Sequence, residues 1–329
     1  MGAETGVIST RRSALALGLG LGAVGLLAAC GQQAEKGLRF RIGYQKNGLL
    51  LVTKTRGTIE ARMKAAGVDR VEWIEFASGP PLLEALAVGS IDFGSTGDAP
   101  PVFAQAAGAD LLYVAAMPIS GKGAAILVPK PSSAKSVADL KGKKIAFTKG
   151  TSAQNFAEVA LRAAGLSVAD VEVANLSPAD GAAAFAKGAL DAWVIWDPYY
   201  ALAERDQGAR VILTAEGVTA SSSFFLARRA FAEANPAVIA AALDEMVVSA
   251  AWSSQNVDEV AKIMADATGI DQSIQKIAAQ RESLNIAPLS ETVLTNQQAL
   301  ADRLYASQAI PKKVVIGDAV WKTSWAPKQ

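Results

Sequence analysis

Apolar and polar side chains alternate along residues 39–44, RFRIGY, and again along residues 71–76, VEWIEF, and each run predicts a half-buried strand. Between them the pattern predicts a helix over residues 50–66. This helix ends at Gly67, because glycine readily takes the left-handed conformation that closes many helices. A further helix is expected over residues 82–88. Strands and helices therefore follow one another in the order of a mainly parallel sheet with helices on both faces.

The next stretch, GSIDFGSTGDAPP at residues 89–101, is the junction around which we organise the chain. It predicts a buried strand over residues 91–94, a small polar loop, and a helix whose first turn holds two prolines. Asp98 is a natural N-cap for this helix, and Gly97 lets a ligand approach the main chain closely. Free N–H groups and the positive end of the helix dipole make the loop a candidate anion site. The alternative is a capped helix that binds nothing.

A similar junction follows further along the chain. After a strand at residues 111–117, the chain crosses through a glycine-containing segment into a second lobe, in which residues 143–147 form a strand. A Gly-bearing loop then leads into a helix at residues 153–164. Thr151 or Ser152 can cap this helix, and their N–H and hydroxyl groups could also hold an anion. The Gly-Lys-Ser/Thr ending of a P-loop is missing, so this is not a nucleotide-binding loop of that kind.

The second lobe repeats a pattern of the first. Residues 89–92 and 188–191 each follow an Ala-rich helix, and each is followed six residues later by another Asp, with Pro just beyond. These later residues are Asp98 and Asp197. The second copy therefore predicts another strand-to-helix junction, with Trp196 at its mouth. Core packing for Trp196 and simple N-capping for Asp197 are the alternatives to ligand contact.

The end of the chain is expected to return to the first lobe and to become helical. Residues 210–213 predict the last strand of the second lobe, residues 214–223 a crossing, and residues 224–227 a strand of the first lobe. The helices that follow are interpreted as amphipathic outer packing without a site, and they cover residues 235–252, 257–268, 273–282 and 291–307. We therefore assign residues 38–122 and 219–329 to the first lobe and residues 123–218 to the second.

The amino-acid composition excludes several kinds of catalytic site, metal site and covalent cross-link. The chain of 329 residues has no His and a single Cys, which excludes Ser-His-Asp, Cys-His and His-metal sites, an internal disulfide and a thiolate metal cluster. Removing residues 1–29 takes away Glu4, Arg11 and Arg12, and leaves 30 basic and 30 acidic residues. This neutral balance gives no indication of a nucleic-acid partner.

The N-terminus predicts export. Arg11 and Arg12 precede an uncharged run, residues 13–29, that is rich in Leu, Ala and Gly and is typical of a signal peptide. The run ends in LAAC, which resembles a bacterial lipoprotein cleavage box and implies cleavage before Cys30 and lipidation of its thiol. Residues 30–37 would then be a tether. An uncleaved membrane anchor is the alternative, but the run is short for a span. We expect no later run to be long and uncharged enough to span a bilayer.

Two α/β lobes joined by two crossings predict a hinge and a cleft. The chain resembles the periplasmic substrate-binding proteins of ABC importers, in the branch that takes up aliphatic sulfonates. The resemblance covers essentially the whole chain after the signal and is carried by residues 42–46, 72–86, 89–111, 137–147, 191–201 and 310–316. The most specific of these segments are GSIDFGSTGD and WDPYY.

The resemblance implies a type II binding-protein fold, a monomer that closes on an alkanesulfonate, and delivery to an ABC permease and its ATPase for sulfur acquisition. It implies no cofactor, metal or catalysis. A sulfonate spreads one charge over three oxygens, so neutral N–H and hydroxyl donors suit it. The resemblance, in agreement with the strand-end argument, places the ligand among Gln45, Ser95, Thr96, Gly97, Asp98, Gly121, Thr151, Ser152, Ala153, Trp196 and Asp197.

Other functions stay open at this point. Taurine, nitrate, a pyrimidine or an aromatic sulfonate are alternative ligands, and some relatives have a His where this chain has Gln154. Pyrimidine-precursor synthases resemble the same family, but they have a Cys-rich motif and an active His, which this chain lacks. We therefore expect a binding protein rather than an enzyme.

Overall fold

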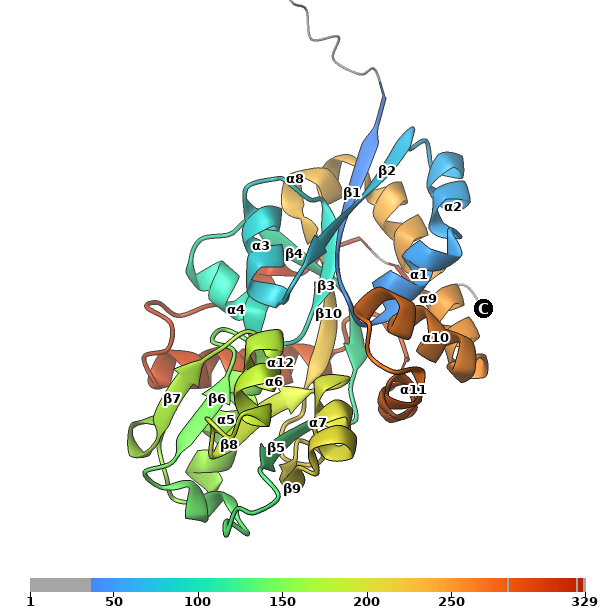
Figure 1. Ribbon diagram of the computed structural model, residues 1–329. Helices are drawn as coiled ribbons and strands as arrows, with labels where there is room; N and C mark the ends of the chain where they lie inside the picture. Colours follow the sequence, from blue (N-terminus) through green and yellow to red (C-terminus); the bar gives the residue numbers. More distant parts are fainter. Residues whose placement is uncertain (1–36, 283, 324, 328–329) are drawn as a thin grey trace, which may run out of the picture. The chain divides into compact units, whose positions relative to one another are not determined.

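The computed structural model describes residues 37–282, 284–323 and 325–327, and this part of the chain is a mixed α/β protein built on two five-stranded sheets (Figure 1). We call the part built around each sheet a lobe. The first sheet has the order β2-β1-β3-β10-β4. Its strands are β1 (Arg39–Gln45), β2 (Arg70–Phe76), β3 (Phe93–Thr96), β4 (Leu111–Pro118) and β10 (Ser222–Arg228).

The strands β1, β2 and β3 are parallel, as the alternation of strand and helix predicted. The strand β10 runs antiparallel to both β3 and β4, because it enters the sheet on the chain's return from the second lobe. The expected strand at residues 91–94 lies two residues further along. The Arg41 main-chain N–H donates to the Asp92 carboxylate at 3.1 Å instead of to a main-chain carbonyl, and the pairing of β3 with β1 begins at Phe93.

Two groups of helices cover the first sheet. One face packs against α1 (Leu49–Arg56), α2 (Ile59–Ala65), α9 (Pro236–Gln255) and α10 (Val257–Thr268). The opposite face packs against α3 (Gly79–Ala87), α4 (Ala99–Ala106) and α12 (Glu291–Ala306). The prediction of one helix over residues 50–66 is wrong. Gly57 has a φ of 63° and its N–H bonds to the Lys54 carbonyl, so α1 ends there and α2 starts in a new direction.

The helix α9 alone among the described helices is long and apolar enough, by length and composition, to cross a membrane. By length and composition, α9 therefore contradicts the expectation that no such segment follows the signal. About half of this window, 56%, is buried inside the protein. Its buried residues include Ile239 and Leu243, which belong to the core beneath the first sheet, and it also carries the buried acids Asp244 and Glu245. These features are those of a core helix.

The second sheet has the order β7-β6-β8-β5-β9, and its strands are β5 (Ala124–Val128), β6 (Lys144–Phe147), β7 (Glu172–Asn175), β8 (Ala192–Trp196) and β9 (Arg210–Thr214). The helix α5 (Ser152–Ala163) packs on one face, and α6 (Pro178–Ala186) and α7 (Tyr199–Gln207) pack on the other. The remaining elements are α8 (Arg229–Ala234), α11 (Gln272–Arg281), and three short 3₁₀ helices at Val137–Leu140, Val168–Asp170 and Ile316–Ala319.

The repeated sequence pattern corresponds to a repeated junction. In the first lobe the Asp92 carboxylate accepts from the Arg41 N–H at 3.1 Å, and its own N–H donates to the Arg41 carbonyl at 2.8 Å. In the second lobe Asp191 makes the same pair of bonds with Lys144, at 2.8 and 2.9 Å. The repeated Asp therefore fixes how the strand after each Ala-rich helix enters its sheet.

The chain passes between the sheets twice, from β4 to β5 and from β9 to β10. The two crossings lie side by side, since the Ile119 N–H donates to the Ser221 carbonyl at 3.2 Å and Pro118 is the register partner of Ser222. This pair of adjacent connections is the two-crossing hinge that the sequence predicted.

A substitution at Gly181 tests the packing that we describe for the second lobe. A Cβ there would lie 2.7 to 3.1 Å from three atoms of the Trp193 indole, which is rigid and fully buried. Although Ala favours a helix over Gly by about 1 kcal/mol, we expect Gly181→Ala to lower the free energy of unfolding by about 1–3 kcal/mol. Denaturant unfolding measures this change.

Gly317→Ala is the matched control, because a Cβ there meets nothing within 4 Å. We expect it to change the free energy of unfolding by less than about 0.5 kcal/mol. Equal stability of the wild-type protein and Gly181→Ala would contradict the packing that we describe.

Candidate functional site

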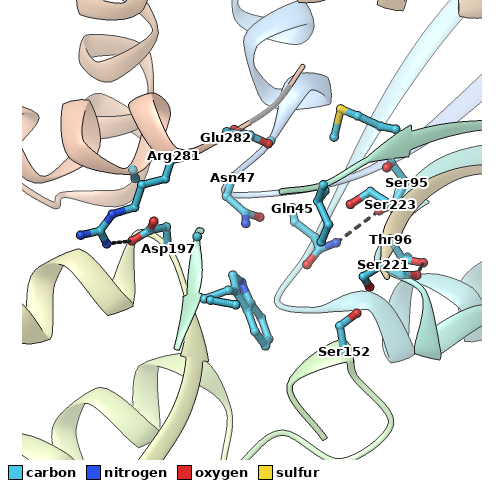
Figure 2. A pocket seen from close by; sticks show the side chains of 18 of the residues that line it. Gln45, Asn47, Ser95, Thr96, Ser152, Asp197, Ser221, Ser223, Arg281 and Glu282 are labelled. Atoms are coloured by element: carbon cyan, nitrogen blue, oxygen red, sulfur yellow. Dashed lines mark hydrogen bonds and ion pairs between the residues drawn. The ribbon is translucent and has the colours of Figure 1, made fainter. Parts of the chain in front are cut away.

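A cavity of about 260 Å³ opens where the two lobes face each other, and both lobes and both crossings line it (Figure 2). Its wall is built from the ends of elements. Gln45 ends β1, Thr96 ends β3, and Ser152 begins α5. The carboxyl ends of parallel strands meet at one edge of a sheet, so polar residues far apart in the sequence come together here.

One side of the cavity is lined by uncharged hydrogen-bond donors. Figure 2 shows Ser95, Thr96, Ser221 and Ser223 on one wall, with Ser152 facing them from the second lobe. Within the described residues the hydroxyls of Ser95, Ser152 and Ser223 make no hydrogen bond, so they are available to a ligand. The Gln45 side chain is already oriented, since its Nε2 donates to the Ser95 carbonyl at 3.2 Å. We call these residues, together with Gly97, the donor wall.

Two helix N-termini reach the donor wall. Gly97 and Pro100 line the cavity at the start of α4, and Thr151, Ser152 and Ala153 line it at the start of α5. The first turn of a helix has the positive end of the dipole and N–H groups without intrahelical partners. In α4 the Ala99 N–H donates to Asp98, and Pro100 and Pro101 have no N–H, so this end offers an anion the dipole alone. The Thr151 hydroxyl does not cap α5, because it donates to the Thr148 carbonyl at 2.6 Å. This end of α5 therefore keeps donors free for an anion.

Gly121 lies in the first crossing and also lines the cavity. Its φ is 78°, and a Cβ there would lie 2.7 Å from the main chain of Ala215 and Glu216. Glycine is needed at this position because the two crossings approach each other so closely.

Asp98 is the one predicted site residue that does not line the cavity. It is 3% exposed, and its carboxylate is engaged on both oxygens. One oxygen accepts from the Ala99 N–H at 2.8 Å, which confirms the N-cap. The other accepts from Asn155 of α5 at 3.3 Å and from Ser221 of the second crossing at 2.5 Å. Asp98 therefore joins the first lobe, the second lobe and the hinge.

Asn155, Ser221 and Gln297 were not found from the sequence. Gln297 of α12 donates to the Asp98 carbonyl at 2.7 Å, and Asn155 and Gln297 are both buried. Each lies in a helix or crossing that is distant in the sequence from its partner. A buried amide in an amphipathic helix gives no signal of this role before the chain is folded.

The opposite side of the cavity is charged. Arg281, at the end of α11, lies 3.4 Å from Asp197 and 2.6 Å from Glu204 of α7, and its guanidinium stacks over Tyr200. Glu282 also lines the cavity on this side (Figure 2). The expectation that the C-terminal helices carry no site is wrong here, because α11 packs against α7 of the second lobe and brings Arg281 into the cavity wall.

Asp197 combines two of the roles considered for it. Its Oδ1 accepts from the Ala201 N–H at 3.0 Å in the first turn of α7, while its Oδ2 is buried and has no hydrogen-bond partner among the described residues. Burial raises the pKa of Asp197 to about 6, and the nearby Arg281 opposes that rise. Trp196 is partly buried, packs against the second-lobe core and also lines the cavity, so packing and ligand contact are compatible there.

The described residues contain no group of three or more His, Cys, Asp or Glu side chains that could hold a metal ion. The arrangement offers hydrogen bonds and apolar contact to a small molecule. Its apolar contribution comes from side chains of both lobes, among them Leu50, Met117, Phe156 and Ile195.

Comparison with known proteins gives consistent results. The sequence model of the NMT1-like family matches residues 42–268. One relative, from Escherichia coli strain K12, is named as an aliphatic sulfonates-binding protein. It is 41% identical over 305 residues, which cover 92% of this chain and 94% of the relative.

Two solved structures are also similar. The alkanesulfonate-binding protein SsuA from Xanthomonas axonopodis pv. citri, bound to MOPS, has a TM-score of 0.81 and 41% identity, with 86% of this chain and 98% of that chain covered. The periplasmic aliphatic sulphonate binding protein SsuA from Escherichia coli has a TM-score of 0.80 and 40% identity, with 88% and 94% covered.

The raised pKa of Asp197 predicts a pH dependence of stability. In the folded protein the carboxyl holds its proton up to about pH 6, whereas its ordinary pKa is 3.8. The folded state therefore binds more protons between these values, and the free energy of unfolding falls as the pH rises through this interval, by up to about 3 kcal/mol. Asp197→Asn should flatten this part of the profile in denaturant unfolding experiments.

Asp266→Asn, which changes an exposed carboxylate of α10, serves as control and should leave the slope unchanged. If Asp197→Asn keeps the wild-type slope between about pH 4 and pH 6, the buried state of this carboxyl is contradicted.

Proposed function

The chain belongs to the NMT1-like family, and on this premise we propose that it is an extracytoplasmic solute-binding protein that captures aliphatic sulfonates. It would deliver them to the permease and ATPase of an ABC importer for sulfur acquisition. The observation that carries this proposal is the donor wall: uncharged hydroxyl and N–H donors from both lobes face one cavity, beside two helix N-termini.

The chemistry of a sulfonate suits this wall. Its single charge is shared by three oxygens, each of which accepts hydrogen bonds, so several neutral donors can replace its hydration. The arginine in the cavity, Arg281, is already paired with Asp197 and Glu204. The sulfonate group is therefore assigned to the donor wall rather than to a cation.

The proposed contacts follow from this orientation. Gln45, Ser95, Thr96, Gly97 and Ser152 hold the sulfonate. Trp196 covers the alkyl part, with Gly121, Thr151 and Ala153 completing the wall beside it. Asp197 and Arg281 lie toward the far end of the ligand. Asp98 acts on the joint between the lobes and does not touch the ligand.

Closure is the second part of the proposal. Residues 38–122 and 219–329 would move as the first lobe and residues 123–218 as the second, about the two adjacent crossings. Contacts between lobes lie on both sides of the cavity, at Asp98 with Asn155 and at Arg281 with Asp197. A ligand that binds both lobes favours the arrangement in which these contacts form.

Location and anchoring are proposed from the sequence. Residues 1–29 would be a signal peptide, and Cys30 would carry the lipid that anchors a monomeric, extracytoplasmic binding protein to the membrane, with residues 30–37 as tether. Cys30 lies outside the described residues. A relative of this chain is named as periplasmic, which agrees with export.

A non-catalytic role is favoured over an enzyme on the same fold. The chain has no His, and its only Cys is in the signal box, so a nucleophile activated by His is excluded. Taurine, nitrate and other small anions remain competing ligands, because a wall of neutral donors suits small oxyanions with a single charge.

Equilibrium titration of the purified protein against alkanesulfonates of increasing chain length, taurine, nitrate and sulfate tests the ligand. We expect alkanesulfonates to bind most tightly, with affinity rising as the alkyl chain lengthens, by about 0.8 kcal/mol for each buried CH₂. Tight binding of another class of ligand, with no binding of any sulfonate, would overturn the proposal that sulfonates are the ligands. Chemical turnover of the ligand would overturn the proposed non-catalytic role.

Two substitutions test the donor wall. Ser152→Ala removes one hydroxyl donor and should weaken sulfonate binding by about three- to thirtyfold. Gly97→Val should weaken it by about tenfold or more, because a Cβ at Gly97 would collide with the adjacent Ser152 Oγ of the second lobe. Both variants should keep wild-type unfolding curves, which far-UV circular dichroism monitors.

Ser254→Ala, at an exposed position near the end of α9, is the control and should bind as the wild type does. Wild-type affinity in both Ser152→Ala and Gly97→Val would place the sulfonate group elsewhere.

A further inference from the structure

A second cavity, of about 360 Å³, lies beside the hinge. It is lined by α5 of the second lobe, α12 of the first lobe and the second crossing, with the residues Val159, Arg162, Ala163, Val218, Thr219, Ala220, Asn296, Ala299 and Arg303. Thr219 lines both this cavity and the cavity of the candidate site. We call the second cavity the hinge-side cavity.

Its two arginines are the exceptions among the arginines of the described residues. Every other one has an ion pair, a hydrogen bond or an aromatic ring as partner, whereas Arg162 and Arg303 have none. They come from facing helices of different lobes and carry the same charge. Like charges held near each other without a counter-charge cost free energy, and a bound anion removes that cost.

Arg303 adds an independent observation. Its Nε is buried and has no hydrogen-bond partner among the described residues. Burial lowers the pKa of Arg303 and the charge of Arg162 lowers it further, while the charges of Asp98 and Glu158 oppose this shift. A buried donor without an acceptor is costly, so the Arg303 guanidinium is electrostatically unsatisfied within the described residues.

The nearby acids do not supply that acceptor. No Asp or Glu lines the hinge-side cavity. Glu158, one turn before Arg162 on α5, accepts from Gln154 at 2.7 Å and forms no ion pair with either arginine. Asp98, whose charge also reaches Arg303, is engaged by Ala99, Asn155 and Ser221. The cavity wall therefore has two unpaired positive charges and the polar side chains of Thr219 and Asn296.

We propose that the hinge-side cavity is a second anion site that binds a small tetrahedral oxyanion of the sulfate or phosphate type between Arg162 and Arg303. The guanidinium of Arg303 offers a planar set of N–H donors that matches two oxygens of such an anion, and Arg162 supplies the second charge. The cavity of about 360 Å³ is large enough for a small free ion, which would contact the part of the Arg303 guanidinium that lines it.

This site differs from the donor wall in its chemistry. The donor wall has neutral donors and suits a singly charged sulfonate, whereas the hinge-side cavity has two charged donors and favours a doubly charged ion. Its occupant would contact both lobes and the second crossing, and it would therefore resist motions that separate α5 from α12.

Calorimetric titration of the full protein with sulfate, at constant ionic strength, tests the proposal. We expect one sulfate site that weakens by about tenfold in Arg162→Gln and in Arg303→Gln, and less in Arg303→Lys, which keeps the charge but loses the planar set of donors. Lys187→Gln removes one exposed charge elsewhere on the second lobe and should bind sulfate as the wild type does. A parallel titration with phosphate ranks the two ions.

Ser152→Ala shows which of the two cavities binds sulfate, because Ser152 lines only the cavity of the candidate site. Sulfate binding that falls in Ser152→Ala but not in the arginine variants would place the ion at the donor wall and overturn the proposal. No sulfate binding by the wild type, or equal binding by all variants, which would indicate an adventitious ion only, would also overturn it. If Arg303→Gln fails to fold, the sulfate affinity of Arg162→Gln tests the proposal instead, because Arg162 is exposed.

Discussion

The hydrogen bonds of the buried Asp98 carboxylate hold the two lobes and the hinge in the arrangement that forms the site. A charge removed from water must be matched by hydrogen bonds, and Asp98 obtains them from the start of its own helix, from Asn155 of the other lobe and from Ser221 of the hinge. These partners can all be reached only when the lobes approach and the crossings lie together. The same bonds fix the start of α4, where Gly97 and Pro100 line the cavity.

The cavity beside this junction has two chemically different sides. The donor wall presents hydroxyls and helix N-termini without a full charge, whereas the far side holds the Arg281, Asp197 and Glu204 cluster, in which the cation is already paired. Neutral donors release a ligand more readily than a buried arginine would, because no unpaired charge remains behind in the empty site. This property suits a protein whose ligand must be both captured and passed on.

Much of this arrangement could be predicted from the sequence. Alternating side chains located the strands, and the repeated Asp at positions 92 and 191 indicated that two junctions share one design, which their matching hydrogen bonds to Arg41 and Lys144 confirm. Strand ends with small polar residues indicated the cavity wall, because parallel strands bring their carboxyl ends together. Local rules of this kind depend on neighbours in the sequence, so the sequence is sufficient to apply them.

Other features depend on contacts between distant segments. The pattern of residues 50–66 reads as one helix, and only the backbone at Gly57 shows that it is two. Arg281 and Gln297 lie in amphipathic helices like any others, yet packing of α11 on α7 and of α12 near α4 brings them to Asp197 and to Asp98.

Hydrophobic periodicity and turn chemistry act over a few residues, so they are sufficient to predict the α/β lobes, their order along the chain and the residue types at the strand ends. By contrast, Asp98 joins the lobes rather than lining the cavity, and two unpaired arginines line a second cavity, through contacts that form only in the folded chain. Both outcomes depend on which side chains meet across the hinge, and the balance between burial and hydrogen bonding there is set by residues more than fifty positions apart.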